Sequence, residues 1–195
     1  IGYLSLNANI AGNNNTALGS RSLQSTTGSD NTAVGYWSLK ANTSGAKNTA
    51  IGTRALYTTT TGTDSVAIGY EALYSMAGQY DNTAIGWKSM RAYTGLSSVA
   101  IGWEAMSGAT GGSRSVAIGG RALNSQTNGN ENIAIGFQSL KSNTSGASNV
   151  AAGKDSLDAN TTGSNNVAMG LHALGANTTG SSSVAIGHNA LDQTT

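Results

Sequence analysis

Apolar and small residues recur in this chain at a fixed interval, within a motif that reads Asn/Ser-Thr/Val-Ala-Ile-Gly. The closing glycine of one motif is followed by the next after 17 residues in nine cases and after 16 in two. Large and small side chains alternate through the motif, which is typical of a β-strand. The anchor glycines are Gly2, Gly19, Gly35, Gly52, Gly69, Gly86, Gly102, Gly119, Gly136, Gly153, Gly170 and Gly187.

A repeat of this length indicates a solenoid made of short strands. Helical-hairpin repeats need about 33 residues or more, and leucine-rich repeats need roughly 20 to 29 with several leucines each. A unit with one leucine and one isoleucine cannot bury enough surface alone, so identical units must stack. We therefore expect an all-β, parallel β-solenoid of about 11 to 12 rungs, with a 16–17-residue repeat, running over residues 1–195 as one array.

Two apolar columns are candidates for the interior of the coil. One lies four residues after the anchor glycine, and the other lies directly before it. The larger side chains of the strand most simply fill the interior. The Ala/Gly positions then either form a smooth face for close approach of another chain or merely line a narrow coil with no partner. The predicted core residues are Leu56, Leu73, Leu123, Leu140, Ile51, Ile68, Ile85, Ile101, Ile118 and Ile135.

Two further columns predict how the rungs turn and stack. Each rung carries the anchor glycine and a second, loop glycine, and both are expected where the backbone adopts positive φ. An Asn/Ser column, with members such as Asn48 and Asn149, precedes each strand. Asparagine side chains in such a column can form a hydrogen-bonded ladder along a solenoid, or can simply reflect the preference of asparagine for turns.

The composition excludes several functional classes. Only 10% of residues are charged, against about 25% in ordinary domains, and the net charge is +1. Neither nucleic-acid binding nor membrane insertion is expected, because there is no basic excess and no run of about 18 apolar residues. Cysteine is absent. His172 and His188 are the only histidines, too few for a closed zinc site, so we expect no metal, no cofactor and no enzyme.

Aromatic residues recur in the column directly after the anchor glycine. Tyr70, Trp87 and Trp103 occupy three consecutive rungs and are expected to stack as a ladder. The column can be a receptor or glycan strip, or it can pack against a neighbouring chain or nearby side chains. The residues of this candidate site are Tyr36, Tyr70, Trp87, Trp103 and Phe137.

A column of threonines just before the loop glycine suggests an alternative function. It contains Thr26, Thr43 and Thr60, is interrupted at Met76, Tyr93 and Ala109, and resumes later in the chain. Regular threonine arrays on flat solenoids are found in ice-binding proteins, so a monomeric ice-binding solenoid is the alternative hypothesis.

The motif itself resembles a known family. Segments such as Ser65–Gly69, Ser115–Gly119 and Ser183–Gly187, each reading Ser-Val-Ala-Ile-Gly, look like the head repeats of YadA-type trimeric autotransporter adhesins. The longer unit Asn48–Leu56 resembles repeats of phage tail-fibre-like proteins, and the 17-residue length favours that branch. The resemblance covers the whole chain and implies a left-handed β-roll, a homotrimer and a role in surface attachment.

These observations predict a structural or adhesive fibre segment. We expect an extracellular location, on a cell surface or a virion tail fibre, and a host-cell glycan or protein as the partner. Both termini fall inside the repeat pattern, so we also expect the chain to be a fragment of a longer fibre.

Overall fold

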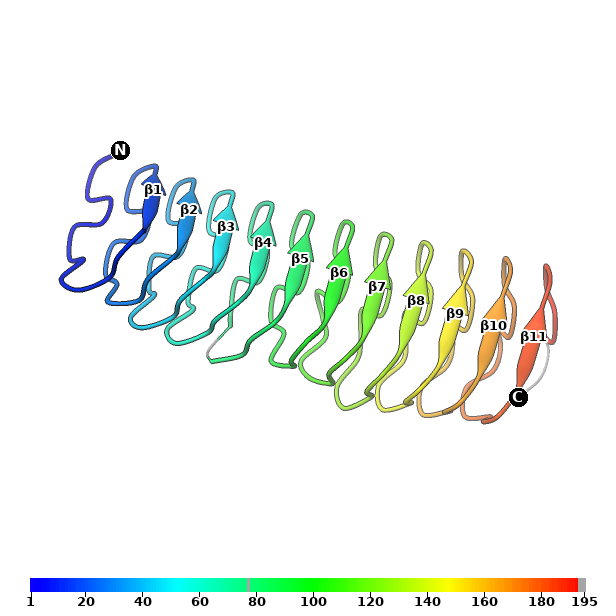
Figure 1. Ribbon diagram of the computed structural model, residues 1–195. Coiled ribbons are helices and arrows are strands. Elements are labelled where there is room, and N and C mark those ends of the chain that lie inside the picture. Colours follow the sequence, from blue (N-terminus) through cyan, green and yellow to red (C-terminus); the bar gives the residue numbers. More distant parts are fainter. Residues whose placement is uncertain (77, 193–195) are drawn as a thin grey trace.

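The chain forms a rod of stacked turns, as described by a computed structural model covering residues 1–76 and 78–192 (Figure 1). Eleven strands of three residues each form one parallel sheet in sequence order, and the described residues contain no helix. The strands are β1 (Thr16–Leu18), β2 (Thr32–Val34), β3 (Thr49–Ile51), β4 (Val66–Ile68), β5 (Thr83–Ile85), β6 (Val99–Ile101), β7 (Val116–Ile118), β8 (Ile133–Ile135), β9 (Val150–Ala152), β10 (Val167–Met169) and β11 (Val184–Ile186).

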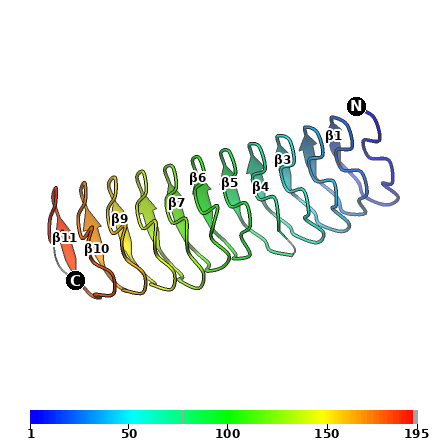
Figure 2. The same ribbon diagram turned by 180° about the vertical axis from the view of Figure 1, so that it is seen from behind.

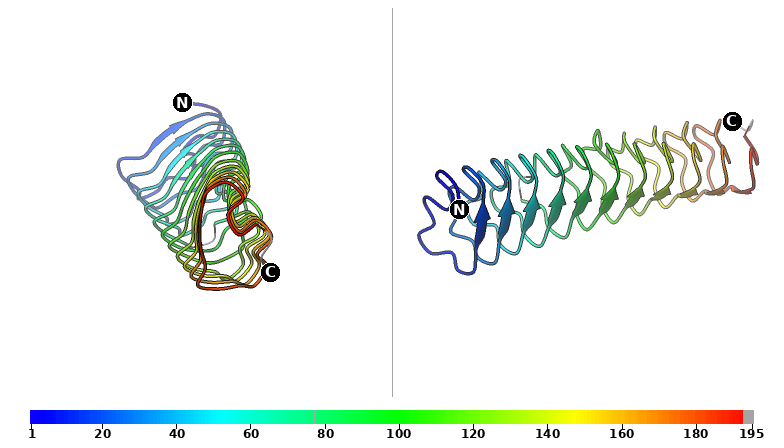
Figure 3. Two further views of the ribbon diagram at one scale, coloured as in Figure 1. Left: turned by 90° about the vertical axis from the view of Figure 1, so that its right-hand side faces the viewer. Right: turned by 90° about the horizontal axis from the view of Figure 1, so that it is seen from above.

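Each repeat closes one turn of the coil, which confirms the predicted parallel solenoid. Strand β3 pairs with β4 so that Ala50 lies beside Ala67, the same position of the next repeat. The 16-residue repeats keep this register, since Ala84 of β5 pairs with Ala100 of β6. Viewed towards its end, the rod shows its turns one behind another with a gradual rotation (Figure 3, left). Viewed from behind and from above, it shows the strands of the sheet following one another along its whole length (Figures 2 and 3).

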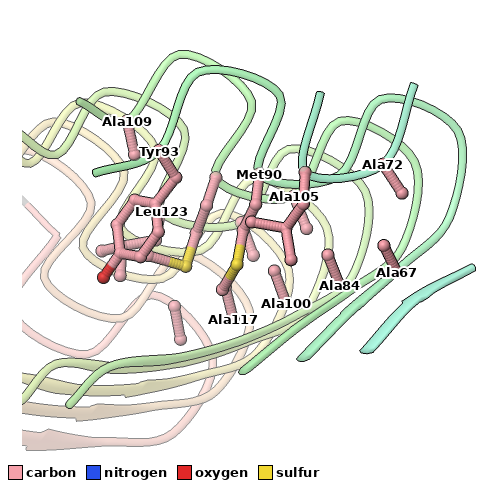
Figure 4. Packing of buried hydrophobic residues seen from close by; sticks show 14 of the residues in the cluster. Ala67, Ala72, Ala84, Met90, Tyr93, Ala100, Ala105, Ala109, Ala117 and Leu123 are labelled. Atoms are coloured by element: carbon pink, nitrogen blue, oxygen red, sulfur yellow. The ribbon is translucent and has the colours of Figure 1, made fainter. Parts of the chain in front are cut away.

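The interior of the coil is lined by leucine and alanine rather than by isoleucine. Leu56, Leu73, Leu123 and Leu140 have no exposed surface, and neither has the central alanine of nine of the eleven strands. Figure 4 shows the strand alanines Ala84, Ala100 and Ala117 lying opposite Met90 and Leu123. The core is therefore a narrow layer in which each leucine or methionine meets a wall of alanines.

The predicted inward orientation of the isoleucine column is wrong. The flanking residues of every strand are partly or fully exposed and the central alanine is buried. The coil is too narrow for a second large side chain opposite the leucine, so only alanine fits inside. The isoleucines on the outer face of the sheet are Ile51, Ile68, Ile85, Ile101, Ile118 and Ile135. The predicted Ala/Gly contact face is wrong for the same reason, whereas the alternative, that the alanines line a narrow coil, is confirmed for the strand alanines.

The turns require unusual backbone conformations at non-glycine residues. In the rung after β3, Arg54 and Leu56 have φ values of 59° and 50°, and Asp64 has φ of 54°. Left-handed conformations cost about 1–2 kcal/mol each for L-residues. At these two residues the N–H groups point to opposite sides of the rung: Arg54 donates to Tyr36 of the preceding rung, and Leu56 donates to Ala72 of the following one. Stacking therefore stabilises a conformation that one rung alone would not hold.

The two glycines of each rung serve different purposes. The anchor glycine has positive φ, as predicted, with 131° at Gly52. The loop glycines Gly45 and Gly62 lack positive φ, so that part of the prediction is wrong for them. A Cβ on Gly45 would lie 2.3 Å from the carbonyl oxygen of Gly62, so here the absence of a side chain permits close contact between rungs.

The predicted amide ladder is present inside the coil. Asn48 donates its side-chain amide to the carbonyl oxygen of Gly62 at 2.7 Å, and its own backbone N–H is accepted by Oδ1 of Asn31 in the preceding rung at 3.0 Å. A second interior amide pair joins Asn160 Nδ2 to Asn143 Oδ1 at 2.9 Å. Buried asparagines thus join consecutive rungs and satisfy the loop carbonyls.

Candidate binding surfaces

The described part of the chain offers no enclosed site for chemistry. It contains no detectable pocket and no group of three or more His, Asp or Glu side chains placed to hold a metal ion. His172 Nε2 lies 3.8 Å from Asp155 Oδ2 at the surface. The candidate functional features are therefore the outer surfaces of the rod.

One surface follows the carboxyl ends of the strands, along the turns beyond the arrowheads in Figure 1. We call it the ridge, and it comprises the first, second and fifth positions after each anchor glycine from Gly19 to Gly136. Its aromatic members are Tyr36, Trp37, Tyr57, Tyr70, Tyr74, Trp87, Trp103 and Phe137. Its basic members are Arg21, Lys40, Arg54, Lys88, Arg91, Arg121 and Lys141.

The five predicted site residues all lie on the ridge and are about 40% exposed, at 39–43%. The expected stacking of Tyr70, Trp87 and Trp103 is not among the ring contacts of the described residues. Two other ring pairs stack instead: Tyr36 and Trp37, adjacent in one rung, have ring centroids 4.4 Å apart. Those of Tyr57 and Tyr74, at the fifth position of consecutive rungs, are 5.0 Å apart. Sequence reasoning missed Trp37, Tyr57 and Tyr74, which recur too irregularly to stand out as a column.

Cations cover several of the ring faces. Lys40 Nζ lies 4.6 Å from the centre of Trp37, and Lys88 Nζ lies 4.2 Å from that of Trp87. The guanidinium of Arg121 sits 4.6 Å from the ring centre of Trp103. Such contacts keep the long basic side chains against the ridge, so that they move less freely in solvent.

A buried glutamate organises the centre of the ridge. Glu71 is only 4% exposed, and it accepts hydrogen bonds from Arg91 Nε at 2.8 Å and from Arg54 at 3.3 Å. Burial acts to raise the pKa of Glu71, but hydrogen bonds from Arg91, Tyr70 and Arg54 outweigh it, so the pKa lies below its ordinary value. The carboxylate therefore stays ionised at neutral pH and fixes two guanidinium groups from rungs on either side.

The outer face of the sheet is the second surface, and it carries no charge. We call it the sheet face; it consists of the first and third residues of every strand, which are threonine or apolar. Its larger residues are partly exposed, with Ile118 at 37%, and Ile186 of the last strand reaches 69%. A flat apolar strip along a whole rod is unusual for a surface that faces water.

A threonine column forms the third surface, and it includes every predicted member except Thr26. Thr27 donates its hydroxyl to the carbonyl oxygen of Thr43 at 2.8 Å, and Thr43 donates to Thr60 at 2.9 Å. Thr26 is buried instead, beside Asn42. The residues predicted to interrupt the array, Met76, Tyr93 and Ala109, are buried as well, and the ladder includes Thr94, Thr110, Thr127, Thr144, Thr161 and Thr178.

An acidic cluster lies beyond the ridge, towards the carboxyl-terminal end of the rod. Burial raises the pKa of Asp158, with a further contribution from the charge of Asp155, while His172 and Lys141 act in the opposite direction. Asp155 itself is paired through Oδ2 with Lys154 at 3.2 Å, and its Oδ1 is buried without a hydrogen-bond partner. Ionisation of Asp158 is therefore disfavoured in the folded chain.

Asp158→Asn is expected to stabilise the rod at neutral pH. Because the folded-state pKa of Asp158 is raised, its ionised form disfavours folding, and this penalty disappears as the pH falls through that pKa. We expect the melting temperature to rise by about 1–3 °C at pH 7, and the gain to shrink towards pH 4 as the wild-type carboxyl becomes protonated. Thermal unfolding across this pH range measures the effect. Asp64→Asn, at an exposed loop position, is the control; equal gains from both substitutions would contradict the assignment.

No family model, curated protein or solved structure matches this chain. Among residues 1–76 and 78–192 no helix is long and apolar enough to cross a membrane.

Proposed function

We propose that this chain is a structural and adhesive segment of a trimeric extracellular fibre. The observation that carries the proposal is the sheet face, an uncharged strip that extends through all eleven strands. A strip of this kind is stable in water when another apolar face covers it, and the same face of a second copy has matching rung spacing and chemistry. We propose that the sheet faces pack around a common axis.

The number of chains and the setting come from the repeat motif. The Ser-Val-Ala-Ile-Gly segments resemble repeats of trimeric adhesin heads and tail fibres, in which three left-handed rolls assemble. On this proposal the rod gives length and rigidity, the sheet faces hold the chains together, and the ridge and the threonine column remain available to a host or surface partner.

Sedimentation equilibrium of the purified chain tests the proposal. A mass of three chains that persists on dilution is expected, and a monomer at all concentrations would overturn it. Small-angle scattering of the same sample should give the cross-section of three rods packed side by side along their lengths.

Ice binding by a monomer is the second candidate, favoured by the exposed threonine ladder. Its hydroxyl donors are already used, since Thr127, Thr144 and Thr161 each donate to the carbonyl oxygen of the next rung. The hydroxyls therefore have less capacity to order water, which places this function second. A monomeric sample with thermal hysteresis would reverse the order.

A further inference from the structure

The ridge concentrates most of the positive charge of the chain. Seven of the ten lysine and arginine residues lie on it, together with only two carboxylates, Glu71 and Glu104, so its net charge is +5. The rest of the chain then carries −4, because the total is +1. Eight of the eleven aromatic residues lie on the same surface. A nearly neutral protein thus presents one strongly basic, aromatic face.

The ridge keeps a net positive charge, because its two carboxylates pair with only three of its seven cations. Glu71 engages Nε of Arg91, and Glu104 engages Nε of Arg121 at 2.9 Å. Among the described residues, the terminal amino groups of these two guanidiniums make no hydrogen bond to either carboxylate. These side chains are 44% and 40% exposed, so their donors remain accessible to an anionic oxygen. Lys40 and Lys88 rest on aromatic rings and have no carboxylate within ion-pair distance among the described residues.

These cations are spaced at regular rung intervals along the axis of the rod. Rungs are separated by about 4.8 Å in the strand-pairing direction, so cations one or two rungs apart repeat at roughly 5 to 10 Å. Lys40 and Arg54 occupy neighbouring rungs, and Lys88 and Arg91 share a rung two turns further along. A linear polyanion lying along the ridge can meet one cation after another without bending.

Whether the faces of the aromatic rings are free or covered decides which kind of polyanion the ridge suits. Single-stranded nucleic acid needs bare ring faces on which its bases can stack. On the ridge, Lys88 covers a face of Trp87, Arg91 covers one of Tyr74, and Tyr36 stacks on Trp37. The exposed parts of this surface therefore include tyrosine hydroxyl, ammonium and guanidinium donors. Such donors suit the hydroxyls and anionic groups of a carbohydrate better than they suit bases.

We propose that the ridge binds a linear polysaccharide carrying regularly spaced anionic groups, laid along the axis of the rod. This inference rests on the attachment role proposed above and specifies the chemical class of the partner. The ring-supported cations Lys40 and Lys88 supply charge without a competing carboxylate, and the arginines fixed by Glu71 and Glu104 supply hydrogen-bond donors. The neutral donors on the ring edges contact the sugar hydroxyls.

Binding of a sulfated oligosaccharide, compared with its desulfated counterpart of the same backbone, tests the proposal. Wild-type protein is expected to bind only the sulfated form, with an affinity that falls as salt is added. The double variant Lys40→Gln, Lys88→Gln is expected to lose roughly tenfold in affinity. Isothermal titration calorimetry measures both effects.

The matched control removes the same charge elsewhere. Lys47 and Arg114 directly precede the Asn/Ser column at the amino-terminal ends of β3 and β7, away from the ridge. The variant Lys47→Gln, Arg114→Gln is expected to bind as wild type does. Equal losses in the two variants would show that only net charge matters and would overturn the proposal, as would equal binding of the desulfated sugar or tighter binding of a single-stranded oligonucleotide.

Sedimentation of the same samples separates this inference from the proposed function. A trimer that binds no sulfated sugar overturns the inference alone. A monomer that binds the sulfated sugar and responds to the ridge variant overturns the trimeric fibre and leaves the ridge assignment intact.

Discussion

Replacing Ala117 with aspartate is expected to disrupt the rungs around β7 and to lower the free energy of unfolding by about 3–5 kcal/mol. Ala117 has no exposed surface, and its strand neighbours in the sheet are Ala100 and Ala134. Opposite it lie apolar side chains such as Leu123 (Figure 4). A carboxylate at this position would therefore be enclosed with no basic partner, and it would also exceed the volume that the alanine wall leaves.

Hydrogen exchange resolves this effect better than a single melting curve, because each rung of a solenoid contacts mainly its neighbours. Protection should be lost first at β6, β7 and β8 and should persist towards the two ends of the rod. Ala117→Ser, which keeps the volume and adds a hydroxyl without a charge, is the matched control and should cost much less. Uniform protection in the aspartate variant would contradict a buried alanine column.

The period and the stacking of this fold could be predicted from sequence, since each follows from spacing. A repeat of 16 or 17 residues admits few architectures, and one leucine per repeat requires a neighbour for burial. The asparagine ladder follows for a similar reason: a polar residue that returns at the same point of every rung has a copy of itself directly above and below. Asn31 and Asn48 bond in this way.

Hydrophobicity could not predict which face of each strand points into the coil, because the residues on both faces are apolar or small. Choosing the larger side chains for the interior ignored the width of the coil, in which volume limits what can be buried. The sequence does hold a signal for the correct choice. The central position is alanine in all eleven strands, whereas the outer column also accepts Leu18, Val34, Ala152 and Met169. The narrow interior tolerates one residue type, and the open face tolerates several.

Two surface features could not be predicted by comparing the same position in every repeat: the start of the threonine ladder and the ring contacts of the ridge. Counting back from the loop glycine placed Thr26 in the ladder, but the 16-residue rung is one residue shorter, and Thr27 occupies that position. On the ridge, contacts join different columns, as between Trp37 and Tyr57, whose rings are 5.7 Å apart. A column-by-column reading cannot find such pairs, because they depend on how side chains cross between rungs.

Ile118→Asp is expected to abolish assembly while leaving the fold of the single chain intact. The residue neighbours Ala117 in sequence but lies on the sheet face, where the side chain is 37% exposed in the isolated chain. In a monomer its carboxylate would be hydrated, so the stability of the chain should change by less than about 1 kcal/mol. In a trimer formed through this face, each copy would bring an unpaired charge into an apolar contact, at a cost of several kcal/mol.

Sedimentation and circular dichroism together decide the outcome. The variant should sediment as a monomer with a wild-type β-sheet spectrum, whereas Ala117→Asp should lose part of that spectrum. Ser145→Asp, which adds the same charge at an exposed loop position away from the sheet face, should remain trimeric. A trimer that tolerates Ile118→Asp would place the contact between chains on another surface, and the ridge would then be the first alternative, since packing between chains is the other role open to its aromatic rings.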